Sequence, residues 1–157
     1  MTFSDEMTLA DARVELRTLI DHGHKCPLCT RYAKVYLRTI HATMARELIT
    51  FWRVAGREWF DMPDVMVAHR LPGHGDAAKL RYWRLVEPDA EAEPVEGAKQ
   101  AGIWRVTELG EQFVLGRTSV PKYARVYDGR RLGMRGEPVT IIDCLGDKFD
   151  YRELMSR

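Results

Sequence analysis

Two cysteines separated by two residues, Cys26 and Cys29, have the spacing in this chain that most directly indicates chemistry. A Cys-x2-Cys turn brings two sulfur atoms together, which makes the pair a chelating half-site for zinc. A structural zinc site needs two further ligands. His22 and His24 lie just before the pair, so we expect Cys26, Cys29, His24 and His22 to be the candidate ligands of one structural zinc.

The third and fourth ligands of that site have alternatives elsewhere in the sequence. His69 and His74 have a spacing found in zinc modules, and Cys144 is a third option. The two cysteines of the turn also fit a second interpretation, as small and partly buried turn residues. A redox pair is a third interpretation, but the thioredoxin-type motif requires a strand-helix-strand setting that is absent from the pattern. The odd number of cysteines disfavours a disulfide framework and fits a reducing compartment.

A second group of residues has the types that bind DNA. A short helix is expected over residues 77–85, directly before a predicted β-hairpin. In a winged helix-turn-helix protein the helix in this position enters the major groove. The candidate DNA-binding residues on this helix are Lys79, Arg81, Tyr82 and Arg84. Three residues on one face of a second predicted helix, over 31–55, are the candidate phosphate contacts: Arg31, Lys34 and Arg38. Trp83 and Trp104 are expected to pack in the core.

The sequence contains no pattern that indicates catalysis. It has no Gly-x-Ser-x-Gly motif, no recognisable Ser-His-Asp order and no glycine-rich phosphate loop. Asp143, Asp147 and Asp150 lack the dense alternation of a calcium loop, so we expect them to be helix caps and surface charges. His41 is expected to pack within a helix. We therefore predict that the protein is not an enzyme.

Hydrophobic periodicity predicts the helices that position these residues. A helix is expected over residues 8–20, where Thr8 and Asp11 have a capping-box-like spacing. Apolar residues at steps of three and four predict a long helix over 31–55, with Thr30 as its N-cap. This long helix would place the three phosphate-contacting residues on one face.

The remaining elements are expected to be two hairpins and short helices. Residues 84–87 and 103–106 form the first predicted hairpin, with the polar loop 88–101 as the tip of the wing. Thr107 then caps a short helix over 108–115. A second hairpin is expected around Asp128-Gly129, between a strand at 123–127 and its return at 130–134, before a final helical turn at 150–154.

These elements together predict an α+β fold. It consists of a winged helix-turn-helix core with an N-terminal helix and a small C-terminal β/α extension. The predicted divisions are residues 1–30 for the N-terminal helix and Cys-x2-Cys turn, 31–116 for the winged-helix domain, and 117–157 for the C-terminal extension.

The composition is that of an ordinary globular protein of 157 residues with a net charge of +1. Charge is unevenly distributed, since segments 25–57 and 117–135 are basic and 87–96 carries only acids. Such blocks allow a nearly neutral protein to present a basic face. No apolar run approaches the roughly 18 residues of a membrane span, and the acidic N-terminus is unlike a signal peptide. We expect a cytoplasmic protein with no membrane partner.

Four parts of the sequence carry a resemblance to a known group. They are the Cys26-Pro-Leu-Cys29 turn, Lys79–Glu87, the Trp104-x-Val106-Thr107-x-x-Gly110 pattern and Phe149–Met155. In these parts the chain resembles uncharacterised winged-helix proteins encoded by bacteriophages and prophages. The resemblance covers most of the chain from Cys26 onward. It implies a winged-helix fold and a phage setting inside a host bacterium, and it implies no activity.

We expect a phage-encoded, regulatory protein that binds double-stranded DNA. The alternative is a protein-interaction module that binds and inhibits or redirects a host protein. The acidic segment 87–96 favours the alternative, because carboxylates in a wing repel phosphate. Winged-helix DNA binders are often dimers, so helix 8–20 is the candidate interface of a homodimer.

Overall fold

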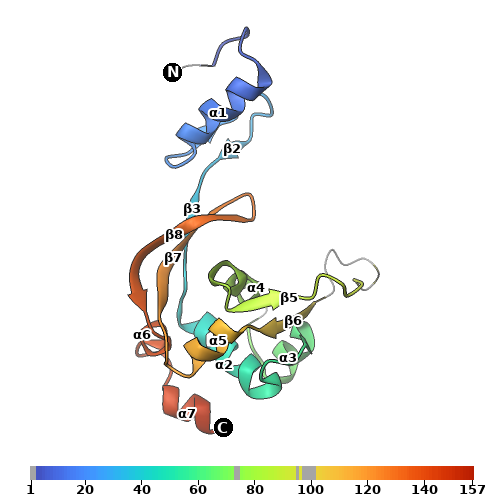
Figure 1. Ribbon diagram of the computed structural model, residues 1–157, viewed down its shortest axis with the longest axis vertical. Helices are drawn as coiled ribbons and strands as arrows, with labels where there is room; N and C mark the ends of the chain where they lie inside the picture. The colour runs from blue at the N-terminus through green and yellow to red at the C-terminus, as the bar shows by residue number, and fades with distance from the viewer. Residues whose placement is uncertain (1–2, 73–74, 95, 97–101) are drawn as a thin grey trace.

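The computed structural model describes residues 3–72, 75–94, 96 and 102–157. The fold is mixed α+β with open antiparallel sheets, as the sequence predicts at this level. Figure 1 shows an N-terminal arm at one end, a long curved hairpin in the middle, and helices around a second sheet at the other end. None of the described helices combines the length and apolar character needed to cross a membrane.

The N-terminal arm, residues 3–35, begins with helix α1 (Leu9–Leu19), which confirms the predicted helix. The Thr8 hydroxyl caps the helix by accepting a hydrogen bond from the amide of Asp11 at 3.1 Å. The helix packs on a small core that is separate from the main core of the protein. The buried residues of this arm core are Ile20, Ala33 and Val35.

The arm continues through the Cys-x2-Cys turn, which connects strand β1 (His24–Lys25) to strand β2 (Tyr32–Ala33). His24 pairs with Ala33 across the hairpin, and the amide of Cys26 donates to the carbonyl of Arg31 at 2.8 Å. The turn is therefore fixed by the backbone on both sides.

The predicted helix over residues 31–55 is wrong in its first part. Residues Tyr36–Thr39 form strand β3, and helix α2 starts only at Ala42 and runs to Ala55. Strand β3 pairs antiparallel with β7 (Val120–Tyr127), a segment far along the chain. Over so short an apolar stretch the periodicities of a helix and a strand are indistinguishable, so this long-range pairing decides the outcome.

Because α2 starts at Ala42, two residues lie in other positions than expected. Thr30 does not cap a helix; it closes the Cys-x2-Cys turn with a left-handed φ of 62°. His41 is the N-cap residue of α2 and lies at its start rather than in its middle. The apolar stripe of α2 is confirmed, because Met44, Leu48 and Phe51 are all buried in the main core.

Helix α3 (Met62–Ala68) follows strand β4 (Phe60–Asp61). Helix α4 (Asp76–Lys79) then continues into a 3-10 helix, η1 (Leu80–Trp83). The helix predicted over residues 77–85 is thus a single α-turn followed by a tighter turn. It ends where Arg84 adopts a left-handed φ of 58°.

The first predicted hairpin is confirmed in strands β5 (Val86–Pro88) and β6 (Ile103–Val106), where Val86 pairs with Val106. Strand β4 joins the other edge of β6, so the sheet order is β4–β6–β5. Part of the expected wing tip, residues 95 and 97–101, lies outside the described residues.

Helix α5 (Glu108–Val114) confirms the short helix predicted after the hairpin. The hydroxyl of Thr107 caps it by accepting from the amide of Gly110 at 3.0 Å. A Cβ atom on Gly110 would lie 2.1 Å from the carbonyl oxygen of Leu85, so glycine allows α5 to approach the chain just before β5.

The second predicted hairpin is also confirmed and is longer than expected. Strands β7 and β8 (Arg130–Val139) are joined at Asp128 and Gly129, whose φ angles of 49° and 72° are those of a type I′ turn. Helices α6 (Ile141–Leu145) and α7 (Tyr151–Ser156) end the chain.

Residues from α2 to α7 share one main core. The segment predicted as a C-terminal extension contributes to it directly, through Val120, Ala124, Ile141, Leu145 and Leu154.

Candidate nucleic-acid interface

The tip of the β7–β8 hairpin lies against η1, the segment expected to contact DNA bases. The hydroxyl of Tyr82 donates to the carbonyl of Gly129 at 3.3 Å, and Arg131 Nη1 donates to the carbonyl of Tyr82 at 3.2 Å. Trp83 Nε1 donates to the carbonyl of Pro121 at 2.7 Å. Because of these contacts Tyr82 is buried, with 8% of its surface exposed, and its ring does not project to the outside.

Two of the other predicted contact residues are held by their own segment. Lys79 Nζ lies 2.6 Å from Asp76 Oδ1, and this hydrogen bond is the main reason that the pKa of Asp76 is lowered. Arg81 donates to the carbonyl of Ala78 at 3.2 Å and to the hydroxyl of Tyr82 at 3.3 Å. Arg84, at the end of η1, is exposed.

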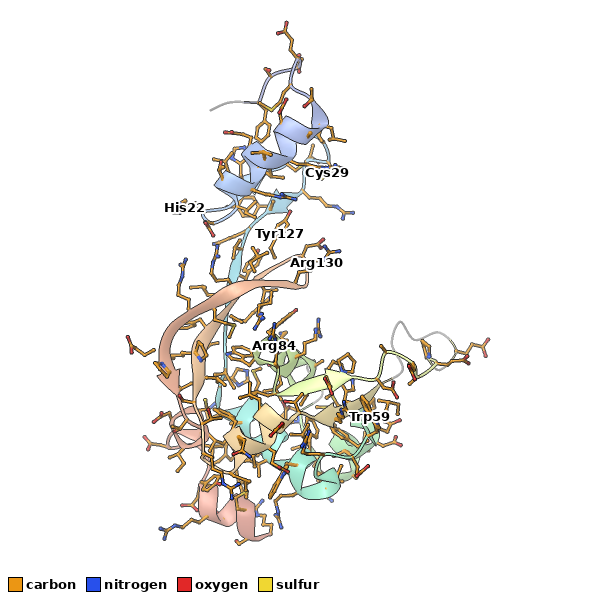
Figure 2. The ribbon with its side chains drawn as sticks, in the orientation of Figure 1. His22, Cys29, Trp59, Arg84, Tyr127 and Arg130 are labelled. Atoms are coloured by element: carbon orange, nitrogen blue, oxygen red, sulfur yellow. The ribbon has the colours of Figure 1, made fainter. Side chains whose placement is uncertain are left out.

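A cleft of about 440 Å³ lies between this segment and the hairpin tip. We call it the arginine cleft, because Arg81, Arg84 and Arg131 contribute to its lining. Arg130, at the start of β8, is exposed beside it, and Figure 2 shows its side chain at the hairpin tip above Arg84. The cleft therefore collects cations from two segments that are distant in sequence.

The cleft has one carboxylate among its described lining residues, Glu87. That carboxylate accepts a hydrogen bond from Arg105 Nε, and the Arg105 guanidinium stacks on Trp59 with Cζ 4.3 Å from the ring centroid. The charge of Glu87 is thus compensated from outside the cleft, which leaves the cleft itself with an excess of positive charge.

The three predicted phosphate-contacting residues do not share a helix face. Arg31 lies at the end of the Cys-x2-Cys turn, Lys34 lies between β2 and β3, and Arg38 lies on β3. Lys34 and Arg38 both approach the ring of Tyr36, with Lys34 Nζ at 5.9 Å and Arg38 Cζ at 5.3 Å from the centroid. The expectation of a single basic helix face is therefore wrong, because residues 31–41 contain no helix.

A second basic hollow, of about 510 Å³, lies between the arm and the β3–β7–β8 sheet. Its cationic lining residues are Lys34, Arg125 and Arg135. Arg125 Nη2 is paired with Asp21 Oδ1 at 2.5 Å, which reduces the positive charge there. The hollow is thus a weaker candidate for anion binding than the arginine cleft.

Sequence reasoning recognised segment 117–135 as basic but assigned no role to Arg130 or Arg131. The signal that could have found them is the Asp128-Gly129 turn, which places both arginines at a hairpin tip. Which part of the protein that tip touches is set by tertiary contacts, so the sequence offers no sign that η1 is its neighbour.

The predicted zinc ligands are only partly brought together. Cys26 and Cys29 come within 3.6 Å of each other. The pKa of the Cys26 thiol is lowered, mainly by a hydrogen bond from the backbone of Cys29 and then by one from the backbone of Leu28. Within the described residues no three His, Cys, Asp or Glu side chains form a group that could hold a metal ion.

The two histidines of the predicted set point elsewhere. The ring of His24 lies 5.7 Å from that of Phe3, and His22 lines the second basic hollow. Figure 2 shows His22 and Cys29 on opposite sides of the arm. Cys144 lies in α6, where burial raises the pKa of its thiol to about 12, and His74 lies outside the described residues.

The two tryptophans near the first hairpin are buried as predicted, with Trp83 2% and Trp104 3% exposed. Both belong to the main core, so neither presents an exposed ring.

Comparison of the chain with protein-family models, with curated proteins and with solved structures gave no match.

Proposed function

We propose that the protein is a winged helix-turn-helix protein that binds double-stranded DNA through the arginine cleft. The fold part of the proposal is supported by the order α2, β4, α3, α4–η1, β5, β6. In this order the last two helical segments precede a hairpin, and the strand after α2 pairs with the second strand of that hairpin. The resemblance to phage and prophage proteins also supports the winged-helix fold and implies no activity.

The observation that carries the DNA part is the convergence of Arg81, Arg84 and Arg131 on one cleft whose described carboxylate is engaged by Arg105. Guanidinium groups bind phosphate with two parallel hydrogen bonds, and phosphate contacts supply much of the affinity of DNA-binding proteins. The cleft therefore has the chemistry of a site for the DNA backbone.

This mode differs from insertion of helix 77–85 into the major groove. The hairpin covers η1, and Tyr82 is engaged with Gly129. A buried side chain does not reach base edges, so we expect binding dominated by phosphate contacts and weakly dependent on sequence. Strong salt dependence follows, because each neutralised phosphate releases counterions.

The first prediction concerns the arginines of the cleft. Anisotropy of a labelled random duplex of about two helical turns is measured from roughly 50 to 200 mM salt. We expect Arg84→Ala and Arg131→Ala each to weaken binding about 5- to 10-fold at low salt and to lower the salt slope by about 1. The matched control is Arg152→Ala, because Arg152 is exposed on α7 and carries the same charge.

Two results would contradict the proposal. One is the absence of binding at about 10 μM wild-type protein in low salt, where even non-specific association is expected. The other is an equal loss of affinity in Arg152→Ala, which would mean that the protein's overall charge matters and the cleft does not.

A second candidate function, binding of a host protein, is favoured by a different observation. A groove of about 440 Å³ beside α3 is lined mainly by apolar side chains, among them Met62, Met66 and Leu71. Val67, on the same helix, has 79% of its surface exposed. An exposed apolar groove of this kind is typical of a surface that binds another protein.

The two functions separate in one experiment. Nuclease-treated host lysate is passed over wild-type protein and over Val67→Asp. A single stoichiometric partner that is lost with Val67→Asp, but retained with Arg84→Ala, would favour the protein-interaction function over DNA binding.

A further inference from the structure

The turn between β1 and β2 presents two thiols at the spacing of a metal chelate. Cys26 and Cys29 come within 3.6 Å of each other, and both cysteines are in the free thiol form. Two sulfurs bound to one tetrahedral zinc, each about 2.3 Å from the metal, lie about 3.8 Å apart. A disulfide would need about 2.05 Å. The two cysteines are thus unbonded and near enough to each other for both to bind one metal ion.

The backbone holds this turn in place. The amide of Cys26 donates to the carbonyl of Arg31 at 2.8 Å, and the amide of Thr30 donates to the carbonyl of Cys26 at 3.0 Å. Thr30 adopts a left-handed φ of 62°, which returns the chain into β2. A preformed turn loses little conformational entropy when it binds a metal.

The turn supplies two ligands, and zinc bound by thiolates takes four. In the part of the chain that the structure describes, no third His, Cys, Asp or Glu side chain joins the pair. His24 is engaged with Phe3, His22 lies on the other side of the arm, and Cys144 lies in α6, next to the main core. In this arrangement a zinc ion bound by the pair would take its other ligands from outside the arm.

We propose that the Cys-x2-Cys turn is half of a zinc site that a second copy of the chain completes. One zinc ion then joins two chains through Cys26 and Cys29 of each. We infer a second copy of the chain because zinc takes four ligands and two identical turns supply four thiolates. This inference is independent of the DNA-binding proposal.

The surroundings of the turn suit such a junction. The turn lies on the arm, at the end of the molecule opposite α7 (Figure 1), so the main body does not block approach of a second arm. Leu28, inside the turn, has 66% of its surface exposed, and Tyr32 has 63%. These apolar surfaces would be covered when two arms meet.

The charges near the turn are also favourable. A zinc ion bound by four thiolates carries a net charge of −2. Lys25 precedes the turn and Arg31 follows it, and both are exposed. Two arms together bring four cations beside that negative charge, which offsets the cost of collecting four thiolates in one place.

The test uses the full chain, kept reduced and stripped of metal by a chelator. Zinc is titrated while the mass in solution is followed by sedimentation. We expect saturation at half an equivalent of zinc per chain, together with a change from the 18.1 kDa monomer to twice that mass. Cobalt serves as a second probe, because four thiolates give stronger sulfur-to-metal absorption than two.

Variants assign the ligands. Cys29→Ser, at an exposed position, is expected to abolish both zinc uptake and the doubling of mass, and Cys26→Ser to do the same. Cys144→Ser is the matched control, because it removes a cysteine that lies away from the turn and leaves both properties unchanged. The double variant His22→Ala/His24→Ala is also expected to retain both.

Three outcomes would overturn the proposal. The first is one zinc per monomer with no change in mass, which indicates ligands from a single chain. The second is loss of zinc in the His22→Ala/His24→Ala variant with circular dichroism unchanged. The third is failure of the reduced wild-type protein to take up zinc.

Discussion

At the scale of single residues, Glu47 is a buried carboxylic acid with few hydrogen bonds or nearby positive charges to stabilise its ionised form. It lies on α2 with 1% of its surface exposed, and its Oε2 has no hydrogen-bond partner among the described residues. Burial, and then the charge of Asp76, raise the pKa of Glu47 from 4.5 to about 7. The folded protein therefore holds a proton there at pH values where the unfolded chain has lost it.

This raised pKa predicts a pH-dependent effect of Glu47→Gln. Stability of the wild type falls as the pH rises from 4.5 to about 7, because ionisation is harder in the folded state. We expect Glu47→Gln to be close to neutral at pH 4.5 and to stabilise the protein by about 1 to 3 kcal/mol at pH 8. Urea denaturation at both pH values measures the difference.

The control for this prediction is Glu58→Gln, because Glu58 is exposed. A gain in stability from Glu47→Gln that is the same at both pH values would contradict ionisation as its cause.

Residue burial was predicted from the sequence where local context decides it. The position of Trp83 and Trp104 at the junction of the helix and the hairpin predicts that they pack in the core, and both are buried. Tyr82 was assigned to a DNA surface and is buried because it meets Gly129, 47 residues away. The local sequence pattern gives no sign of a contact at that separation. For this reason the sequence predicts a site on a helix face, whereas the candidate site in the structure is the arginine cleft.

At the scale of elements, the approach of α5 to the chain before β5 depends on one glycine. A Cβ at Gly110 would lie 2.1 Å from the Leu85 carbonyl oxygen, a backbone atom that moves only with its neighbours. We expect Gly110→Ala to destabilise the protein by about 1 to 3 kcal/mol or more. Thermal unfolding measures it.

The matched control is Gly133→Ala in β8. The nearest atom to a Cβ there is Arg125 Nη1 at 4.0 Å, so there is space for a methyl group. Equal destabilisation by the two substitutions would mean that the lost flexibility of glycine, rather than the close approach, is responsible.

The elements themselves were predicted well where caps and turns mark them. Thr8, Thr107 and the Asp128-Gly129 turn each lie at a predicted boundary that the structure confirms. The segment 31–41 was assigned to a helix because its apolar residues continue the spacing of α2. Its strand forms by pairing with β7, and such a partner is invisible in a local window.

At the scale of the whole molecule, the arm and the main body have separate cores. The arm core contains Ile20, Ala33 and Val35, whereas the main core extends from α2 to α7. Stability is not uniform across a structure, and parts of a protein with separate cores can open with different free energies. The arm, whose core contains only these three buried residues among those described, is expected to be the less stable part.

This difference predicts two kinds of response to cavity-forming substitutions. We expect Leu48→Ala, in the main core, to lower the global free energy of unfolding by about 2 to 5 kcal/mol. Ile20→Ala is expected to accelerate hydrogen exchange of α1 amides while leaving the exchange of α2 amides nearly unchanged. Equal acceleration in both helices after Ile20→Ala would mean that the protein unfolds as a single unit.

Strand β8 is the outer strand of its sheet, in the order β3–β7–β8, and such an edge exposes backbone groups to which another chain can add a strand. Arg130, Arg131 and Arg135 lie along it, and Pro138 lacks an amide proton. Charged side chains and proline on an edge strand discourage growth into aggregated sheets. Arg131, which gives the cleft part of its charge, thus also protects the protein's solubility, so a neutral replacement of Arg131 should be expressed and stored at low concentration.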